Sequence, residues 1–179
     1  MFSESYVYKD ELLKYAKDLL KRKYQKKWFE KTYLIIEKEI FFGFFIIRKL
    51  CESIKISDHL KDKMYKVEKI YYKKPFNINL FNMYKILDYI NLNNIKTDSI
   101  NIEKICNQFI HSYYLFILHE KEDNNIKVLL SSDHSKKKEC LIMNIDTIAS
   151  IFKEFGKNYP NKMESKYNQK TGEITFKVE

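Results

Sequence analysis

The sequence is poor in the residues that interrupt regular structure. It contains only three glycines and two prolines among 179 residues. An all-β protein needs many tight turns, so this scarcity favours long, uninterrupted helices. The three glycines lie far apart, at positions 43, 156 and 172. They cannot form a glycine-rich phosphate-binding loop, which argues against nucleotide binding of that kind.

Cysteine is also scarce, and no long apolar run is present. Cys51, Cys106 and Cys140 are odd in number and form no Cys-x-x-Cys pair, which predicts reduced thiols in a cytoplasmic protein. The first six residues do not resemble a secretory signal. The most apolar run, 40–47, is far shorter than the roughly 20 residues that cross a bilayer. We therefore expect a cytoplasmic protein without a membrane partner.

The net charge of +9 comes almost entirely from lysine, because Arg22 and Arg48 are the only arginines. A basic surface attracts nucleic acids, which would make RNA a candidate partner. The abundance of lysine, isoleucine, asparagine, tyrosine and phenylalanine is equally consistent with a compositional bias of the genome. The sequence leaves both interpretations open.

Hydrophobic spacing predicts an α+β protein. We expect mainly a helical bundle of about four helices over residues 1–119, followed by a small antiparallel β unit over 120–179 that packs on the bundle and is not independent. The expected helices cover 3–25, 30–54, 80–92, 100–118 and 147–156. The expected strands cover 126–130, 139–144 and the two arms of a C-terminal hairpin around the turn 168–172.

The helix predicted at 30–54 is apolar all round between residues 40 and 47, so we expect it to be the most buried element. Gly43 in its middle costs about 1 kcal/mol relative to alanine. A close crossing by another helix would explain that cost. The alternative is that the glycine is simply tolerated.

The predicted helix at 100–118 carries one polar stripe. Ile102, Ile105, Cys106, Phe109, Tyr113, Phe116 and Ile117 fall on one side, as a core face. The opposite side holds Lys104, Asn107, Gln108 and His111. An ammonium group, amides and an imidazole can therefore meet on one ligand.

The segment Cys106-Asn107-Gln108-Phe109-Ile110-His111 resembles the Arg-Asn-x-x-x-His motif of the HEPN superfamily. Asn107 and His111 match, whereas Cys106 occupies the arginine position. In the looser form of the motif, six residues separate the basic residue from the histidine. Lys104 occupies that basic position. The resemblance covers residues 1–118 at most. It implies a helical bundle, often a homodimer, in a bacterial stress, defence or mobile-element setting.

Three alternative functions remain open, the first two of them implied by the resemblance. The first is a non-enzymatic protein that binds RNA or a protein partner. The second is a metal-independent endoribonuclease in which His111 is the base, Asn107 orients it and Lys104 balances charge. Lysine lacks the planar fork with which arginine holds a phosphate, so the missing arginine favours the first alternative. The third is a structural protein–protein interaction module.

Two further alternatives concern His111 and a basic, aromatic stretch. His111 is open to a structural role, bonded to a neighbouring helix or to the turn near residues 57–60. A basic, aromatic stretch could bind RNA by phosphate contacts and base stacking, or form a solvated face. Its candidate residues are Lys63, Lys66, Lys69, Tyr71, Tyr72, Lys73 and Lys74.

The remaining histidines indicate no metal or cofactor site. His59, His119 and His134 are isolated, and no two histidines have the four-residue spacing of a helical metal site. Asp133-His134 lies near two serines, but catalytic triads are assembled in space and not from chain neighbours. That segment is expected to be a solvated loop.

Overall fold

The computed structural model describes residues 4–73, 78–79, 81–120 and 123–179. Within these ranges the helices are α1 (Tyr6–Arg22), α2 (Glu30–Glu52), α3 (Asp58–Asp62), the 3-10 turn η1 (Met83–Lys85), α4 (Ile86–Tyr89), α5 (Ile102–Ile110) and α6 (Ile145–Lys157). The strands are β1 (Met64–Tyr72), β2 (Ile90–Asn101), β3 (Ser112–Glu120), β4 (Asn125–Ser132), β5 (Glu139–Asn144), β6 (Met163–Tyr167) and β7 (Ile174–Val178).

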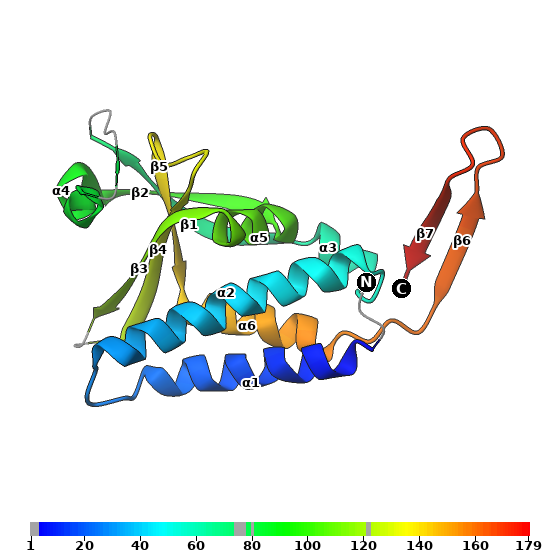
Figure 1. The fold of residues 1–179 in the computed structure, drawn as a ribbon, viewed down its shortest axis with the longest axis horizontal. Helices are drawn as coiled ribbons and strands as arrows, with labels where there is room; N and C mark the ends of the chain where they lie inside the picture. The colour runs from blue at the N-terminus through cyan, green and yellow to red at the C-terminus, as the bar shows by residue number, and fades with distance from the viewer. Residues whose placement is uncertain (1–3, 74–77, 80, 121–122) are drawn as a thin grey trace.

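A five-stranded antiparallel sheet forms the centre of the fold, in the order β2-β1-β5-β4-β3 (Figure 1). Strands 2, 1, 5 and 4 share one hydrophobic core with α1, α2, α5 and α6, which places these helices on one face of the sheet. A second core on the opposite face brings Ile70, Leu129 and Ile142 together with the segment that contains Ile78 and Ile86. Both faces of the sheet are therefore covered over part of their area.

The predicted bundle of four helices followed by a small β unit is wrong, although the protein is α+β. Residues 90–101 and 112–120 are long strands, where the sequence predicted helix or linker. Strand β3 explains the error. Tyr114 and Phe116 contribute to the second core, whereas Leu115 and Ile117 pack against the first. A strand that is apolar on both faces loses the alternation that separates strand from helix.

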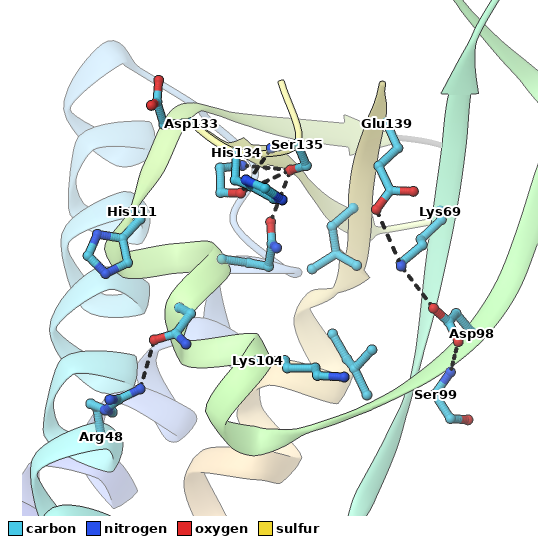
Figure 2. A pocket seen from close by; sticks show the side chains of 15 residues that line it. Arg48, Lys69, Asp98, Ser99, Lys104, His111, Asp133, His134, Ser135 and Glu139 are labelled. Atoms are coloured by element: carbon cyan, nitrogen blue, oxygen red, sulfur yellow. Dashed lines mark hydrogen bonds and ion pairs between the residues drawn. The ribbon is translucent and has the colours of Figure 1, made fainter. Parts of the chain in front are cut away.

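The chain after α5 completes the sheet. The predicted boundary between residues 119 and 120 falls at the end of β3, and strands from both sides of it share the sheet. Helix α5 lies beside the loop that joins β4 to β5, and the Ser135 hydroxyl of that loop donates to Gln108 Oε1 at 3.4 Å (Figure 2). Helix and loop thus border the same part of the sheet.

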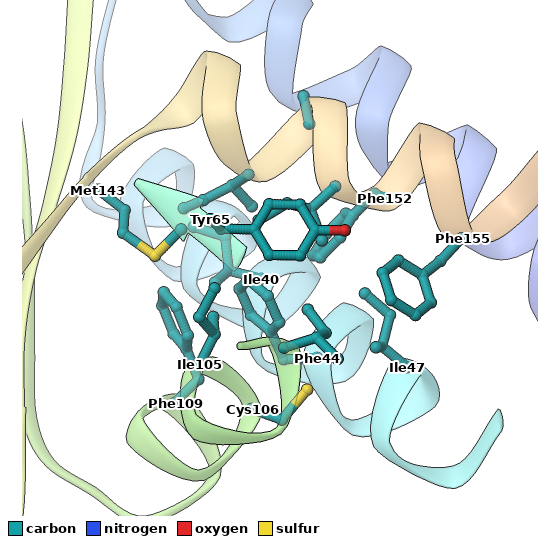
Figure 3. Packing of buried hydrophobic residues seen from close by; sticks show 14 of the residues in the cluster. Ile40, Phe44, Ile47, Tyr65, Ile105, Cys106, Phe109, Met143, Phe152 and Phe155 are labelled. Carbon is teal, nitrogen blue, oxygen red and sulfur yellow. The ribbon is translucent and has the colours of Figure 1, made fainter. Parts of the chain in front are cut away.

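Helix α2 packs on α6 through Gly43. A methyl group at this position would lie 2.1–2.9 Å from the Phe152 ring, so the close helix crossing accounts for the glycine. Phe44 stacks on Phe109 with ring centroids 4.1 Å apart and meets Phe152 edge-on at 5.2 Å (Figure 3). Residues 40–47 are apolar all round, but only one side of α2 faces the core: Phe44 is fully buried, whereas Phe41, Phe42 and Phe45 are exposed.

The three cysteines are free thiols. Cys106 lies in the first core, and burial raises the pKa of the Cys51 thiol to about 11. Cys140 lies in the second core, where its sulfur is 2.8 Å from the Tyr114 hydroxyl, which in turn is 2.7 Å from that of Tyr72. Burial also raises the pKa of the Cys106 and Cys140 thiols, so all three stay protonated at neutral pH. None of the helices within the described residues has the length and apolar character to cross a membrane.

Candidate functional site

An open, polar groove of about 890 Å³ lies between α5, the β4–β5 loop and the strands β1, β2 and β5 (Figure 2). We call it the α5 groove. Its lining residues are Arg48, Lys69, Asp98, Ser99, Ile100, Lys104, Asn107, Gln108, His111, Ser132, Asp133, His134, Ser135, Glu139 and Leu141. It holds the polar stripe that the sequence predicted on one helical face.

Asn101 is the N-cap of helix α5, and its Oδ1 accepts from the backbone N–H of Lys104 at 3.1 Å. His111 is the C-cap, and the next residue already begins β3, so the predicted extension of the helix to residue 118 does not occur. The helical part nevertheless places Lys104, Asn107 and His111 on the same groove. Within the part of the chain that is described, the exposed side chains of Lys104 and His111 make no hydrogen bond or ion pair.

Arg48 enters the groove from α2. Its Nη1 donates to Asn107 Oδ1 at 2.7 Å, and its Nε donates to Glu52 at 2.7 Å. The hydrogen bond to Glu52 raises the pKa of Arg48, which therefore stays charged. A guanidinium thus lies beside Asn107 although Cys106 occupies the arginine position of the local motif. This contact joins residues 59 apart in the sequence, so local spacing did not predict it.

The sheet side of the groove holds a compensated charge cluster. Lys69 Nζ lies 2.9 Å from Asp98 Oδ2 and 3.3 Å from Glu139 Oε1. The hydrogen bond to Asp98 raises the pKa of Lys69 and lowers the pKa of that carboxyl group. The Lys69 charge is therefore already balanced by direct ion pairs, whereas Lys104 forms none among the described residues and acts on Asp98 only at longer range.

The β4–β5 loop brings a second histidine to the groove. His134 is exposed, and the preceding Asp133 forms an ion pair with Lys136 that lowers its pKa. The backbone N–H of Asp133 donates to the carbonyl of His111 at 3.1 Å, which ties the loop to the end of α5. The sequence predicted a solvated loop here, and no local pattern indicated that this loop borders the predicted stripe.

The basic, aromatic stretch predicted as an RNA-binding patch is divided by the alternation of β1. Lys69 lines the groove, whereas Tyr72 packs into the second core on the opposite face. Lys63 pairs with Glu154 at 2.8 Å outside the groove. The exposed Lys66, Tyr71 and Lys73 do not line the groove, and Lys74 lies outside the described residues. The structure thus brings only one member of this set to the predicted stripe.

Metal-binding geometry is absent from the described ranges: they hold no group of three or more histidine, cysteine, aspartate or glutamate side chains placed to bind a metal ion. Comparisons with protein-family models, with curated proteins and with solved structures found no match for this chain.

Proposed function

We propose that the protein binds single-stranded RNA in the α5 groove. The observation that carries the proposal is the meeting of Arg48, Lys104 and His111 on one open polar surface. Lysine and arginine side chains contact phosphates, and exposed imidazole and amide groups can bond ribose hydroxyls and base edges. A bound strand would thus find both kinds of partner in the groove.

The charge distribution indicates where the phosphate would lie. On the sheet side, Lys69 is paired with two carboxylates. On the α5 side, Lys104 forms no hydrogen bond or ion pair among the described residues, although it lies near enough to Asp98 to help Lys69 lower the pKa of that carboxyl group. Arg48 is paired with Glu52 and Glu103 and keeps N–H groups beyond those that bind these carboxylates and Asn107. We place the phosphate over Lys104 and Arg48, with the sugar and base directed to the amides and serines.

The test is the affinity for a fluorescent single-stranded RNA, measured by anisotropy between about 50 and 200 mM salt. We expect binding to weaken steeply with salt. Lys104→Glu should weaken it about tenfold or more and reduce the salt slope. Lys153→Glu, the same charge change at an exposed position on α6, is the matched control. Equal losses in both variants, or no binding at low salt, would contradict the proposal.

A second candidate function is metal-independent cleavage of RNA, favoured by the contact between Arg48 and Asn107. His111 would take the proton of a ribose 2′-hydroxyl. The 2′ oxygen would then attack the adjacent phosphorus, and the bond to the 5′ oxygen would break to leave a 2′,3′-cyclic phosphate. The leaving oxygen takes a proton from His134 or water. Arg48 would stabilise the charge that develops on the phosphate.

Cleavage is tested with single-stranded RNA in the presence of a metal chelator. We expect His111→Ala to abolish cleavage without changing the fold, because the base is lost. We expect Arg48→Lys to slow it, because lysine lacks the planar guanidinium group that could hold a phosphate through two N–H groups. His59→Ala, at an exposed histidine outside the groove, should cleave as the unchanged protein does. Undiminished cleavage by His111→Ala would rule out this function.

The biological setting remains a proposal based on the resemblance to the HEPN superfamily: a cytoplasmic bacterial protein of a stress, defence or mobile-element system. The alternative of a protein–protein interaction module involves apolar surfaces that lie away from the groove.

A further inference from the structure

The hairpin β6–β7 has an apolar face that nothing in the described chain covers. Its strands pair in register from Met163 with Val178 to Tyr167 with Ile174. Alternation therefore puts apolar side chains on one face and Glu164, Lys166, Thr175 and Lys177 on the other. The apolar side chains of Met163, Tyr167, Ile174 and Phe176 are each 43% to 64% exposed. The hairpin is thus amphipathic but unsupported.

The hairpin touches the rest of the protein at its base and projects from it (Figure 1). Val178 is buried, and its backbone N–H donates to Asp58 Oδ2 at 2.8 Å. Residues 163–167 and 174–177 are all exposed. A two-stranded hairpin without a third strand or a packed helix is only marginally stable in water. A covering surface from outside this chain would stabilise it.

The same chain carries a second apolar surface, on α2. Leu34, Phe41, Phe42 and Phe45 are each 37% to 58% exposed and lie on the side of the helix that faces away from the first core. Singly exposed apolar residues are ordinary, but several large ones on one side of a helix indicate an interaction site. The protein therefore has two separate apolar surfaces.

We propose that the β6–β7 hairpin of one copy packs its apolar face on the α2 patch of a second copy, and that the exchange is reciprocal. Large side chains bury about 150–250 Å² each, so four half-exposed side chains offer roughly 400 Å² per surface. One hairpin on one patch would bury roughly 800 Å² in total, which is too little for a stable complex. The reciprocal pair reaches about 1,600 Å², the size of a standard specific interface.

Reciprocity also explains why the occupant is a second copy. A single contact between two different surfaces repeats from copy to copy and produces open chains, whereas a two-fold exchange closes as a dimer and covers all four surfaces.

The first test is the molar mass of the full chain by sedimentation equilibrium at concentrations well above about 1 μM. We expect a dimer, and we expect Phe176→Glu and Phe42→Glu each to convert it to a monomer with an unchanged circular dichroism spectrum. Thr175→Glu, on the polar face of the same hairpin, should remain dimeric. A monomeric unchanged chain, an open series of larger assemblies, or a monomeric Thr175→Glu variant would overturn the proposal.

The second test identifies the contact. A photo-activated cross-linking amino acid in place of Tyr167 should attach to a peptide from residues 30–52 of the other copy. Mixing isotopically labelled and unlabelled chains distinguishes links between copies from links within one copy. Links confined to one copy, or links to another part of the partner, would refute the exchange. Neither experiment requires RNA, so the outcome is independent of the function proposed for the groove.

Discussion

Replacing Phe44 with alanine is expected to lower the free energy of unfolding by about 3–5 kcal/mol. The Phe44 side chain is fully buried, stacks on Phe109 and meets Phe152 edge-on. Its truncation removes apolar area and leaves a cavity where α2, α5 and α6 meet. Since domains are stable by only about 5–15 kcal/mol, this single change would remove a large part of the total. Urea denaturation followed by circular dichroism measures it.

Phe42 provides the matched control on the same helix. The Phe42 side chain is 45% exposed, so Phe42→Ala should cost less than about 1 kcal/mol. The comparison is made at a protein concentration low enough for both variants to be monomeric, because self-association would add to the apparent stability. Similar losses for Phe42→Ala and Phe44→Ala would show that the side of α2 facing the core has been assigned wrongly.

Replacing Gly43 with alanine is expected to destabilise the protein by about 1–3 kcal/mol. Helix propensity alone predicts the opposite, a gain of about 1 kcal/mol. The added methyl group would, however, lie within 3 Å of three atoms of the Phe152 ring. Either that ring or α6 must move, and both are held by the core. Overpacking therefore outweighs propensity at this position.

A double-mutant cycle with Phe152→Leu tests the cause. If the clash with the ring causes the loss, Gly43→Ala should cost less in the Phe152→Leu background, because the shorter side chain leaves room for the methyl group. The destabilisation of the double variant would then be smaller than the sum of the two single losses. A stabilising Gly43→Ala, or a loss independent of residue 152, would contradict the close approach of α2 to α6.

The sequence predicted several elements close to their observed bounds, namely α1, α2, α6, β4, β5 and the hairpin β6–β7. Polar or turn-forming residues lie at the ends of each of them, so its apolar pattern could be read by itself. Strand β3 was missed because it follows α5 directly, and its Tyr113, Phe116 and Ile117 continue the helical spacing of the apolar residues of α5. Strand β2 was missed because its asparagine-rich sequence gives no clear alternation, and its pairing with β1 decides its structure.

The candidate site was likewise predictable only in the part that local spacing along one helix determines. Lys104, Asn107 and His111 fall on one helical face, and local spacing alone brought them together. Arg48 and His134 come from a distant helix and a loop, and only the tertiary fold places them in the groove. For Arg48 the sequence offered one signal, since it is one of two arginines among many lysines.

The strand order has a consequence for the synthesis of the protein on the ribosome. Strand β1 lies between β2 and β5, and α1 and α2 share a core with α6. Neither the centre of the sheet nor the helical layer can close until residues 139–157 have left the exit tunnel. The nascent chain therefore carries α1 and α2 with uncovered apolar sides for most of translation, which makes it a substrate for chaperones. Folding then depends on pairing distant segments, which is slow.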